Sequence, residues 1–254
     1  MPAPKRRLAE PWYGFAFDAG RGKDRAGGRM DTLTRKALVG LAQLEVAVAL
    51  LLFLPAWSLR YWQGWVYWIL FSLCVLAITL YFLKHDPHLV ERRLAGGPWA
   101  EQQTSQKIIQ ALAAPLFVAA MVVPSLDHRF GWSHAPVAMV IAGDAMLVLS
   151  FAIIFFVFKE NSYAAATIRV EAEQRVISTG LYGIVRHPMY AGGVLFFAAT
   201  PLALGSFWGL IEVIPVCAVL VARLLNEERY LSANLPGYDA YRRQVRYRLV
   251  PFVW

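Results

Sequence analysis

The sequence predicts an all-helical protein that crosses a membrane several times, and two observations lead to this fold class. Hydrophobic residues make up 58% of the 254 residues and charged residues 17%, with a mean hydropathy of +0.45. Soluble domains contain about 45–50% apolar and about 25% charged residues. Apolar runs long enough to span a bilayer also recur along most of the chain. We therefore expect a polytopic transmembrane helix bundle with about five to six spans.

Six apolar runs are the candidate spans, since a helix needs about 20 mainly apolar residues to cross the hydrocarbon core. The second run begins with clustered Trp and Tyr, which are typical of membrane interfaces. The third ends at Pro124, and the last two form a tight hairpin around Gly205-Ser206, with a short re-entrant hairpin as the alternative. The runs cover residues 37–55, 63–83, 108–124, 135–158, 189–204 and 207–225.

The polar segments divide the chain into an N-terminal extension and one membrane-embedded domain. Residues 1–29 are rich in glycine and charge and cannot bury much apolar surface, so we expect a disordered basic extension there and a single domain over 30–254. The connections 84–107 and 159–188 are too long to be simple turns. Together with the polar tail 226–254, they are the segments outside the membrane that have room for a site.

The charge distribution predicts the orientation. Of the 25 Lys and Arg residues, 23 fall in alternate connecting segments. By the positive-inside rule both termini are cytoplasmic, and the short loops favour a bacterial inner membrane. The formal charge of +8 then fits an anionic lipid surface rather than nucleic acid. No metal centre is expected, because the five histidines are scattered and Cys74 and Cys217 lie in apolar runs.

The densest group of candidate functional residues lies at the start of the fifth run. Pro188 suits the first turn of a helix, where its missing N–H costs nothing. The free N–H groups of that turn and the helix dipole favour an anion, and Arg186 and His187 add donors. Gly192 and Gly193 leave room for a ligand or for a neighbouring helix. Interfacial charges and packing glycines are the competing interpretation.

A second group lies at the end of the last run. Arg223 and Glu227 are four residues apart and therefore share one helix face. An ordinary surface ion pair is one interpretation. The other is the lip of a polar pocket, in which Glu227 accepts hydrogen bonds from a ligand.

Three segments of the C-terminal part resemble one enzyme family. GLYGIVRHPMYAG at 180–192, RLLNEERYL at 223–231 and GYDAYRRQVRYRLVP at 237–251 are similar, in order and spacing, to the isoprenylcysteine carboxyl methyltransferase family. The resemblance covers about residues 155–251. It implies an integral membrane, S-adenosylmethionine-dependent methyltransferase with its catalytic part in that range. It also implies that the linker, the last hairpin and the tail form the cofactor pocket on the cytoplasmic side.

The resemblance also implies roles for individual residues. Arg223 is expected to bind the substrate, and Arg223 and Glu227 are the expected catalytic residues. The acceptor is expected to be a lipophilic small molecule or a lipidated substrate: a prenylcysteine-like carboxylate, a thiol or a lipid amine. The residues expected to bind the cofactor are Gln174, Arg175, Val176, Ile177, Tyr182, His187, Pro188, Met189, Tyr190 and Glu227.

Two alternatives come from other functional classes. An NADPH-dependent membrane reductase shares parts of this C-terminal pattern and needs cations for phosphate groups. The candidates for that role are Arg242, Arg243, Arg246 and Arg248. A non-catalytic membrane scaffold is the second alternative, in which His187 and Glu227 have no chemical role.

Overall fold

The protein is a bundle of long helices. The computed structural model describes residues 19–96, 104–164, 170 and 174–254, and all regular elements among these residues are helical. The predicted fold class is thus confirmed. The elements are α1 (Ala19–Ala56), α2 (Trp62–His85), α3 (Pro87–Leu94), α4 (Thr104–Phe130), α5 (Val137–Glu160), η2 (Gly180–Gly183), α6 (Pro188–Ala203), η3 (Trp208–Glu212), α7 (Val213–Asn234) and α8 (Tyr238–Gln244).

Five of the described segments are long and apolar enough to cross a membrane. Each has 24 to 27 residues and contains an 18-residue stretch with a mean hydropathy of at least 2.0. They are α2, α4, α5, the Met30–Ala56 part of α1, and Trp208–Asn234, which joins η3 to α7. The apolar helix α6 is shorter, with 16 residues. Large apolar side chains such as Leu73, Ile141 and Ile214 are exposed on the outer faces. These features indicate an integral membrane protein.

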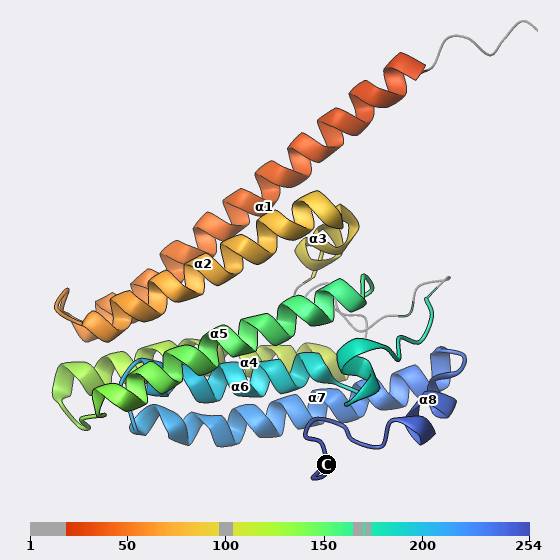
Figure 1. The fold of residues 1–254 in the computed structure, drawn as a ribbon. Coiled ribbons are helices and arrows are strands. Elements are labelled where there is room, and N and C mark those ends of the chain that lie inside the picture. The colour runs from red at the N-terminus through yellow and green to blue at the C-terminus, as the bar shows by residue number, and fades with distance from the viewer. Residues whose placement is uncertain (1–18, 97–103, 165–169, 171–173) are drawn as a thin grey trace, which may run out of the picture.

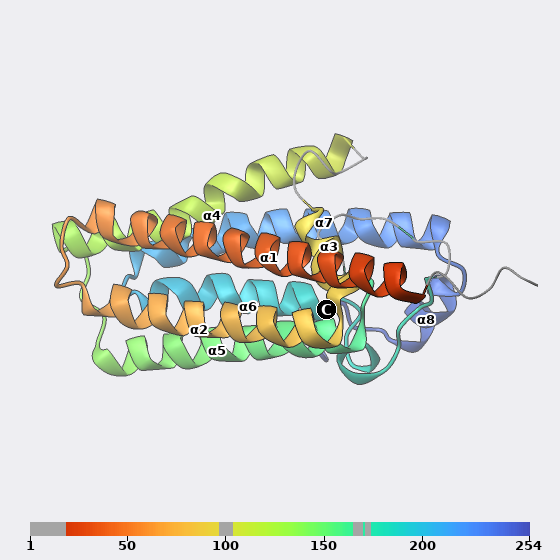
Figure 2. The ribbon, with the colours of Figure 1, turned by 90° about the horizontal axis from the view of Figure 1, so that it is seen from above.

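The connections between the helices gather at two opposite ends of the bundle. Figures 1 and 2 both show α3 and α8 at one end, together with the described parts of the linker between α5 and α6. We call this the linker end, the linker being residues 161–187 and the tail residues 235–254. The turns between α1 and α2, α4 and α5, and α6 and η3 lie at the far end (Figure 1).

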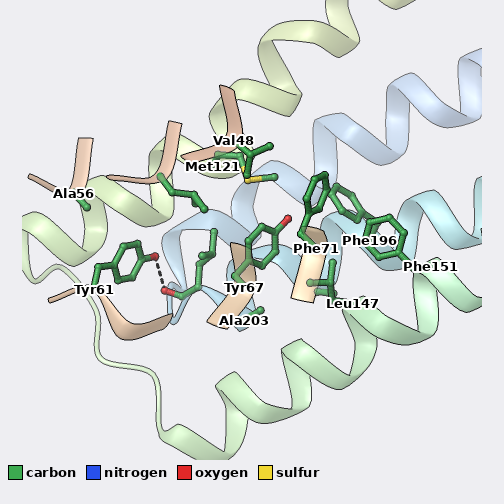
Figure 3. Packing of buried hydrophobic residues seen from close by; sticks show 13 residues of the cluster. Val48, Ala56, Tyr61, Tyr67, Phe71, Met121, Leu147, Phe151, Phe196 and Ala203 are labelled. Carbon is green, nitrogen blue, oxygen red and sulfur yellow. Dashed lines mark hydrogen bonds between the residues drawn. The ribbon is translucent and has the colours of Figure 1, made fainter. Parts of the chain in front are cut away.

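A buried aromatic core holds α2, α5 and α6 together. The rings of Phe71, Phe151 and Phe196 contact one another, with centroids 5.5 to 6.3 Å apart (Figure 3). The hydroxyl of Tyr67 lies 3.1 Å from the hydroxyl oxygen of Thr200 and shares a hydrogen bond with it. This core fixes α5 and α6, which supply part of the functional site, against the N-terminal helices.

Helices α5 and α6 approach so closely that one crossing point requires glycine. A Cβ atom at Gly143 would lie 2.3 Å from the backbone nitrogen of Ala203 and 2.7 Å from the carbonyl carbon of Leu202. Backbone atoms cannot move aside as a flexible side chain does. The missing side chain therefore permits the contact along which α5 supports α6.

A buried carboxylate holds the far end together. Asp127, 1% exposed, accepts hydrogen bonds from the Ser133 amide at 2.7 Å and the Ser206 hydroxyl at 2.5 Å. Ser206 lies in the turn between α6 and η3, so Asp127 joins α4 to the last hairpin. Tyr61 donates to the carbonyl of Leu204 in the same turn at 2.8 Å (Figure 3).

The third span is longer than the sequence predicts. The prediction ends it at Pro124, but α4 continues to Phe130 with Pro115 and Pro124 inside it. The ring of Pro124 lies against Gly209, where an added Cβ would come within 2.9 Å of Pro124 Cγ. Space left by this glycine lets the hairpin pack on the proline, and packing of this kind is how membrane helices tolerate proline.

The first helix begins earlier than expected. α1 starts at Ala19, inside the segment 1–29 for which disorder is predicted, while residues 1–18 of that segment lie outside the described residues. Adding residues to an existing helix is far easier than nucleating one. The apolar Met30–Ala56 stretch therefore supports a polar extension toward the N-terminus.

Candidate functional site

The linker end contains a cavity of about 390 Å³ formed by α3, the linker, α5, α6, α7 and α8. We call it the linker cavity. The structure brings together all eleven residues for which the sequence predicts a role, although they come from three separate stretches of the chain. The residues are Gln174, Arg175, Val176, Ile177, Tyr182, His187, Pro188, Met189, Tyr190, Arg223 and Glu227. Their individual roles stay predictions.

The tail holds the linker in place over the cavity. Val176 packs against a small apolar cluster that includes Leu235, Tyr238 and Tyr241. Tyr241 also donates a hydrogen bond from its hydroxyl to the carbonyl of Tyr182 at 2.8 Å. Sequence reasoning does not select Tyr238 and Tyr241 as cavity residues, yet both line the linker cavity. Their spacing in the tail gives one signal, because residues three apart on a helix share a face.

Tyr182 presents a neutral hydroxyl to the cavity. The side-chain amide of Asn161 donates to this hydroxyl at 3.0 Å, which leaves the hydroxyl proton of Tyr182 available for a ligand. Burial, helped by the nearby negative charge of Glu227, raises the pKa of Tyr182 to about 12, although the hydrogen bond from Asn161 opposes this shift. Tyr182 is therefore a hydrogen-bond donor at any physiological pH.

The start of α6 is built as the sequence predicts, but its basic residues are used differently. Pro188 occupies the first turn, and no side chain caps the helix at His187. The backbone amides of Arg186 and His187 donate to the tail carbonyls of Tyr247 at 2.9 Å and Arg248 at 3.0 Å. These two backbone hydrogen bonds hold the segment that leads into α6 against the tail.

Tyr190 and Glu227 form a close polar contact across the cavity. The Tyr190 hydroxyl donates to Glu227 Oε2 at 2.6 Å, which joins α6 to α7. Arg223 lies on the same face of α7 and lines the same cavity, and its charge acts on the Tyr190 hydroxyl. This geometry favours the pocket interpretation of Arg223 and Glu227 over that of an ordinary surface pair.

A second carboxylate, that of Glu228, lies outside the cavity lining and contacts three basic side chains. Its Oε1 lies 2.9 Å from Arg186 Nε and 3.3 Å from His187 Nε2, and its Oε2 accepts from Arg248 Nε at 3.0 Å. Glu228 is 4% exposed, and Arg186 and His187 are also buried. Arg186 and His187 are thus not the free donors at the pocket mouth that the sequence suggests, although both line the cavity.

Sequence reasoning does not separate Glu228 from its neighbour. The Glu-Glu doublet marks the position, but adjacent helical residues point about 100° apart. Their different roles depend on which face of α7 meets α6 and which meets the tail.

The two glycines of α6 divide between packing and the site. A Cβ at Gly192 would meet side-chain carbons of Ile153 and Ile154 on α5 at 3.2 and 3.3 Å, so this glycine serves helix packing. Gly193 lines the cavity and has ordinary space, with the nearest atom, on Leu220, at 3.8 Å. Both interpretations of the glycine pair therefore apply, one at each position.

Two comparisons with known proteins give a match. Residues 138–236 match the sequence profile of the phospholipid methyltransferase family. The similarity is to methyltransferases. The phospholipid methyltransferase match covers α5, α6, α7 and the linker between them. It leaves the tail and the N-terminal helices outside.

A curated relative supports this similarity. A stretch of 100 residues is 30% identical to methanethiol S-methyltransferase of Crocosphaera subtropica (strain ATCC 51142 / BH68). This stretch is 39% of the chain and 35% of the relative, so the chain matches about a third of the relative's length. The comparisons support the coarser expectation of a membrane methyltransferase. The comparisons do not show the more specific assignment to the isoprenylcysteine carboxyl methyltransferase family.

Proposed function

We propose that this protein is an integral membrane methyltransferase that transfers a methyl group from S-adenosylmethionine to a lipophilic acceptor. The observation that carries the proposal is the Tyr190–Glu227 contact, 2.6 Å long, inside a cavity lined by all eleven predicted residues. The proposal includes a cytoplasmic linker end and cytoplasmic termini, because Lys and Arg follow the positive-inside distribution. It also includes a bacterial inner membrane, which the short loops favour.

The cavity has the size and the polar groups that the cofactor requires. Its volume of about 390 Å³ lies in the range of about 300–1,000 Å³ found for small-molecule sites. The hydroxyl of Tyr238 fits a site for a polar ligand, because Tyr238 lines the cavity while this buried oxygen has no hydrogen-bond partner among the described residues. Buried polar atoms nearly always have a partner.

The residues present suit the two ends of S-adenosylmethionine. The Glu227 carboxylate can accept from the cofactor's ammonium or ribose hydroxyl groups, while Tyr190 keeps it aimed across the cavity. The Tyr182 hydroxyl can donate a hydrogen bond to the cofactor's carboxylate. The apolar wall formed by Ile154, Leu220 and other cavity residues excludes water from the reacting atoms.

When bound, the cofactor supplies a methyl group made electrophilic by a sulfonium. The protein has mainly to align the methyl with the acceptor, because holding two reactants in line removes much of the entropic barrier. Arg223 can hold an acceptor carboxylate, which needs no general base. A thiol acceptor reacts as its thiolate, and the cation of Arg223 favours that charged form.

The proposal is tested by cofactor binding and methyl transfer with purified protein in lipid nanodiscs. We expect labelled S-adenosylmethionine to bind, and the label to pass to one class in a panel of lipophilic thiols, carboxylic acids and lipid amines. Glu227→Gln is expected to weaken cofactor binding about tenfold or more. Glu91→Gln, on the surface of α3, is the matched control and is expected to bind as the wild type does.

The same assay separates the alternatives. Of the four arginines proposed for a reductase, Arg248 is engaged by Glu228 and Arg242 donates to Ser232. None of the four is among the described residues that line the linker cavity. Binding of NADPH in place of S-adenosylmethionine would overturn the methyltransferase proposal, and binding of neither cofactor would favour a scaffold.

A further inference from the structure

A second cavity lies beside the first, on the side of the N-terminal helices. It has a volume of about 450 Å³ and is formed by α1, α2, α3 and α5. Thirteen of its fifteen lining residues are apolar, and the two others are Thr79 and Arg93. We call it the apolar cavity. The part of it formed by α1, α2 and α3 lies outside the stretch that matches the methyltransferase family.

The two cavities share a wall. Arg93 and Ile154 line both of them. The guanidinium of Arg93 donates to the carbonyl of Ala164 at 3.3 Å and lies 4.6 Å from the ring centre of Phe158. Arg93 is thus fixed in the wall between a polar compartment and an apolar one. Desolvation by the surrounding side chains lowers the pKa of Arg93 to about 10, so the side chain remains cationic at neutral pH.

We propose that the apolar cavity binds the hydrocarbon chain of the methyl acceptor, with the acceptor's reactive head beside Arg93 and directed into the linker cavity. This inference rests on the proposed function and names its substrate class: a molecule with one long apolar chain and a thiol or carboxylate at its end. The adjacency of the two cavities, which share Arg93 and Ile154 in their lining, carries the argument. An acceptor as small as methanethiol has no use for 450 Å³ of apolar volume.

The chemistry at the shared wall is consistent with such a head group. A cation beside a thiol or carboxylic acid favours the anion, which is the nucleophile in each case. The acceptor's sulfur or oxygen forms a bond to the methyl carbon while the bond from that carbon to the sulfonium sulfur breaks. The electron pair of the broken bond stays on the cofactor sulfur, which becomes a neutral thioether, and the acceptor's proton passes to water.

Gly40 offers a way to fill the apolar cavity without disturbing the helices. A Cβ atom at Gly40 would meet its nearest atom, Leu94 Cδ2, at 3.9 Å, which is an ordinary contact. Gly40→Leu therefore adds bulk inside the cavity. Two controls are available on α1: Gly40→Ala removes the glycine but adds little volume, and Val39→Leu adds bulk at a neighbouring residue that is 49% exposed.

The first experiment measures methylation of alkanethiols from methanethiol to dodecanethiol in lipid nanodiscs. In the wild type and both controls, KM is expected to fall as the chain lengthens. Gly40→Leu is expected to raise KM for dodecanethiol about tenfold or more, because several methylenes lose their burial. Methanethiol kinetics and cofactor affinity are expected to stay unchanged. The same chain-length dependence in Gly40→Leu and Val39→Leu would overturn the inference.

A second experiment does not depend on the reaction. A long-chain alkanethiol that carries a photoreactive diazirine is expected to label residues 37–44 in the wild type, with less labelling in Gly40→Leu and competition by dodecanethiol. Competition by bulk phospholipid alone would mean that the cavity holds a structural membrane lipid, and the inference would fail. Failure of the proposed function would give a different result. The wild-type protein would then not bind S-adenosylmethionine, while the photoreactive alkanethiol would still label residues 37–44.

Discussion

Arg248 donates a hydrogen bond from Nε to Oε2 of Glu228 at 3.0 Å, and this contact joins the tail to α7. The other carboxylate oxygen of Glu228 faces Arg186 and His187, which lead into α6. One buried carboxylate therefore holds together the three segments that close the linker cavity. Glu228 is a positioning residue, whereas its neighbour Glu227 faces the cavity itself.

Substituting each partner of the Arg248–Glu228 contact in turn distinguishes its effect on the position of the tail from its effect on the stability of the fold. Glu228→Ala leaves Arg186 and His187 buried without their carboxylate, and breaking such a buried pair costs about 3–5 kcal/mol. Arg248 is partly exposed, so Arg248→Ala is expected to cost only about 1 kcal/mol but to free the tail. We expect faster amide hydrogen exchange at residues 245–254 in Arg248→Ala, with unchanged exchange in α5. Unaltered exchange in the tail would show that Glu228 does not hold it.

The hydropathy of the chain accounts for much of the bundle but not for its boundaries. The predicted runs 63–83 and 189–204 agree within a few residues with α2 and α6, because apolar length alone determines a span. The extension of α4 past Pro124 depends on space at Gly209, which comes from a distant segment. A local proline signal carries no information about such a partner.

The site was predictable where neighbouring residues in the chain carry its chemistry. The start of α6 and the Arg223–Glu227 pair are readable as short motifs, whereas the linker stretch 174–177 follows only from the family resemblance. All of them line one cavity. Arg93 was not predictable, because its role depends on where α3 packs. The cap of α3 is local: Pro87 is in its first turn, and Asp86 accepts a hydrogen bond from the Leu89 amide at 3.1 Å.

The Tyr190–Glu227 contact gives a direct test of cofactor recognition. Tyr190→Phe removes the hydroxyl that holds the Glu227 carboxylate, and hydrogen bonds to charged groups are worth about 1.5–3 kcal/mol. We expect the Kd for S-adenosylmethionine to rise about tenfold in Tyr190→Phe and in Glu227→Gln, and the double variant to lose less than the sum of the two. Isothermal titration calorimetry measures all three. Tyr230→Phe, outside the linker cavity, is the control, and strict additivity would contradict the coupling.

Two glycines allow a role in helix packing to be distinguished from a role in lining the cavity. Gly143→Ala forces a Cβ against backbone atoms of α6, as close as 2.3 Å, and overpacking of this kind costs about 1–3 kcal/mol. Gly193→Ala meets nothing closer than 3.8 Å and is expected to leave the stability unchanged. Thermal unfolding in detergent should therefore show a lower midpoint for Gly143→Ala alone. Equal midpoints for the two variants would mean that α5 and α6 do not cross at Gly143.

Buried tyrosines of the linker end predict how stability depends on alkaline pH. Burial raises the pKa of Tyr182 to about 12 and raises that of Tyr241 well above its ordinary value, whereas an unfolded tyrosine ionises near pH 10. Above about pH 10 the unfolded chain has lost these protons and the folded chain retains them. The stabilisation is thus complete below that pH and is lost as the pH rises through the folded pKa.

Each such tyrosine contributes a slope of about 1.4 kcal/mol per pH unit between the unfolded and folded pKa values. Tyr182→Phe and Tyr241→Phe each remove one titrating group. Each variant is therefore expected to unfold with a shallower pH dependence above about pH 10, and the double variant with the shallowest. Thermal unfolding in detergent from neutral to strongly alkaline pH measures this, and tyrosinate absorbance reports the ionisation directly. If all four proteins lost stability with the same slope, the linker and tail would have to open before Tyr182 and Tyr241 ionise. The Tyr241 hydroxyl would then not hold the linker at Tyr182 under those conditions.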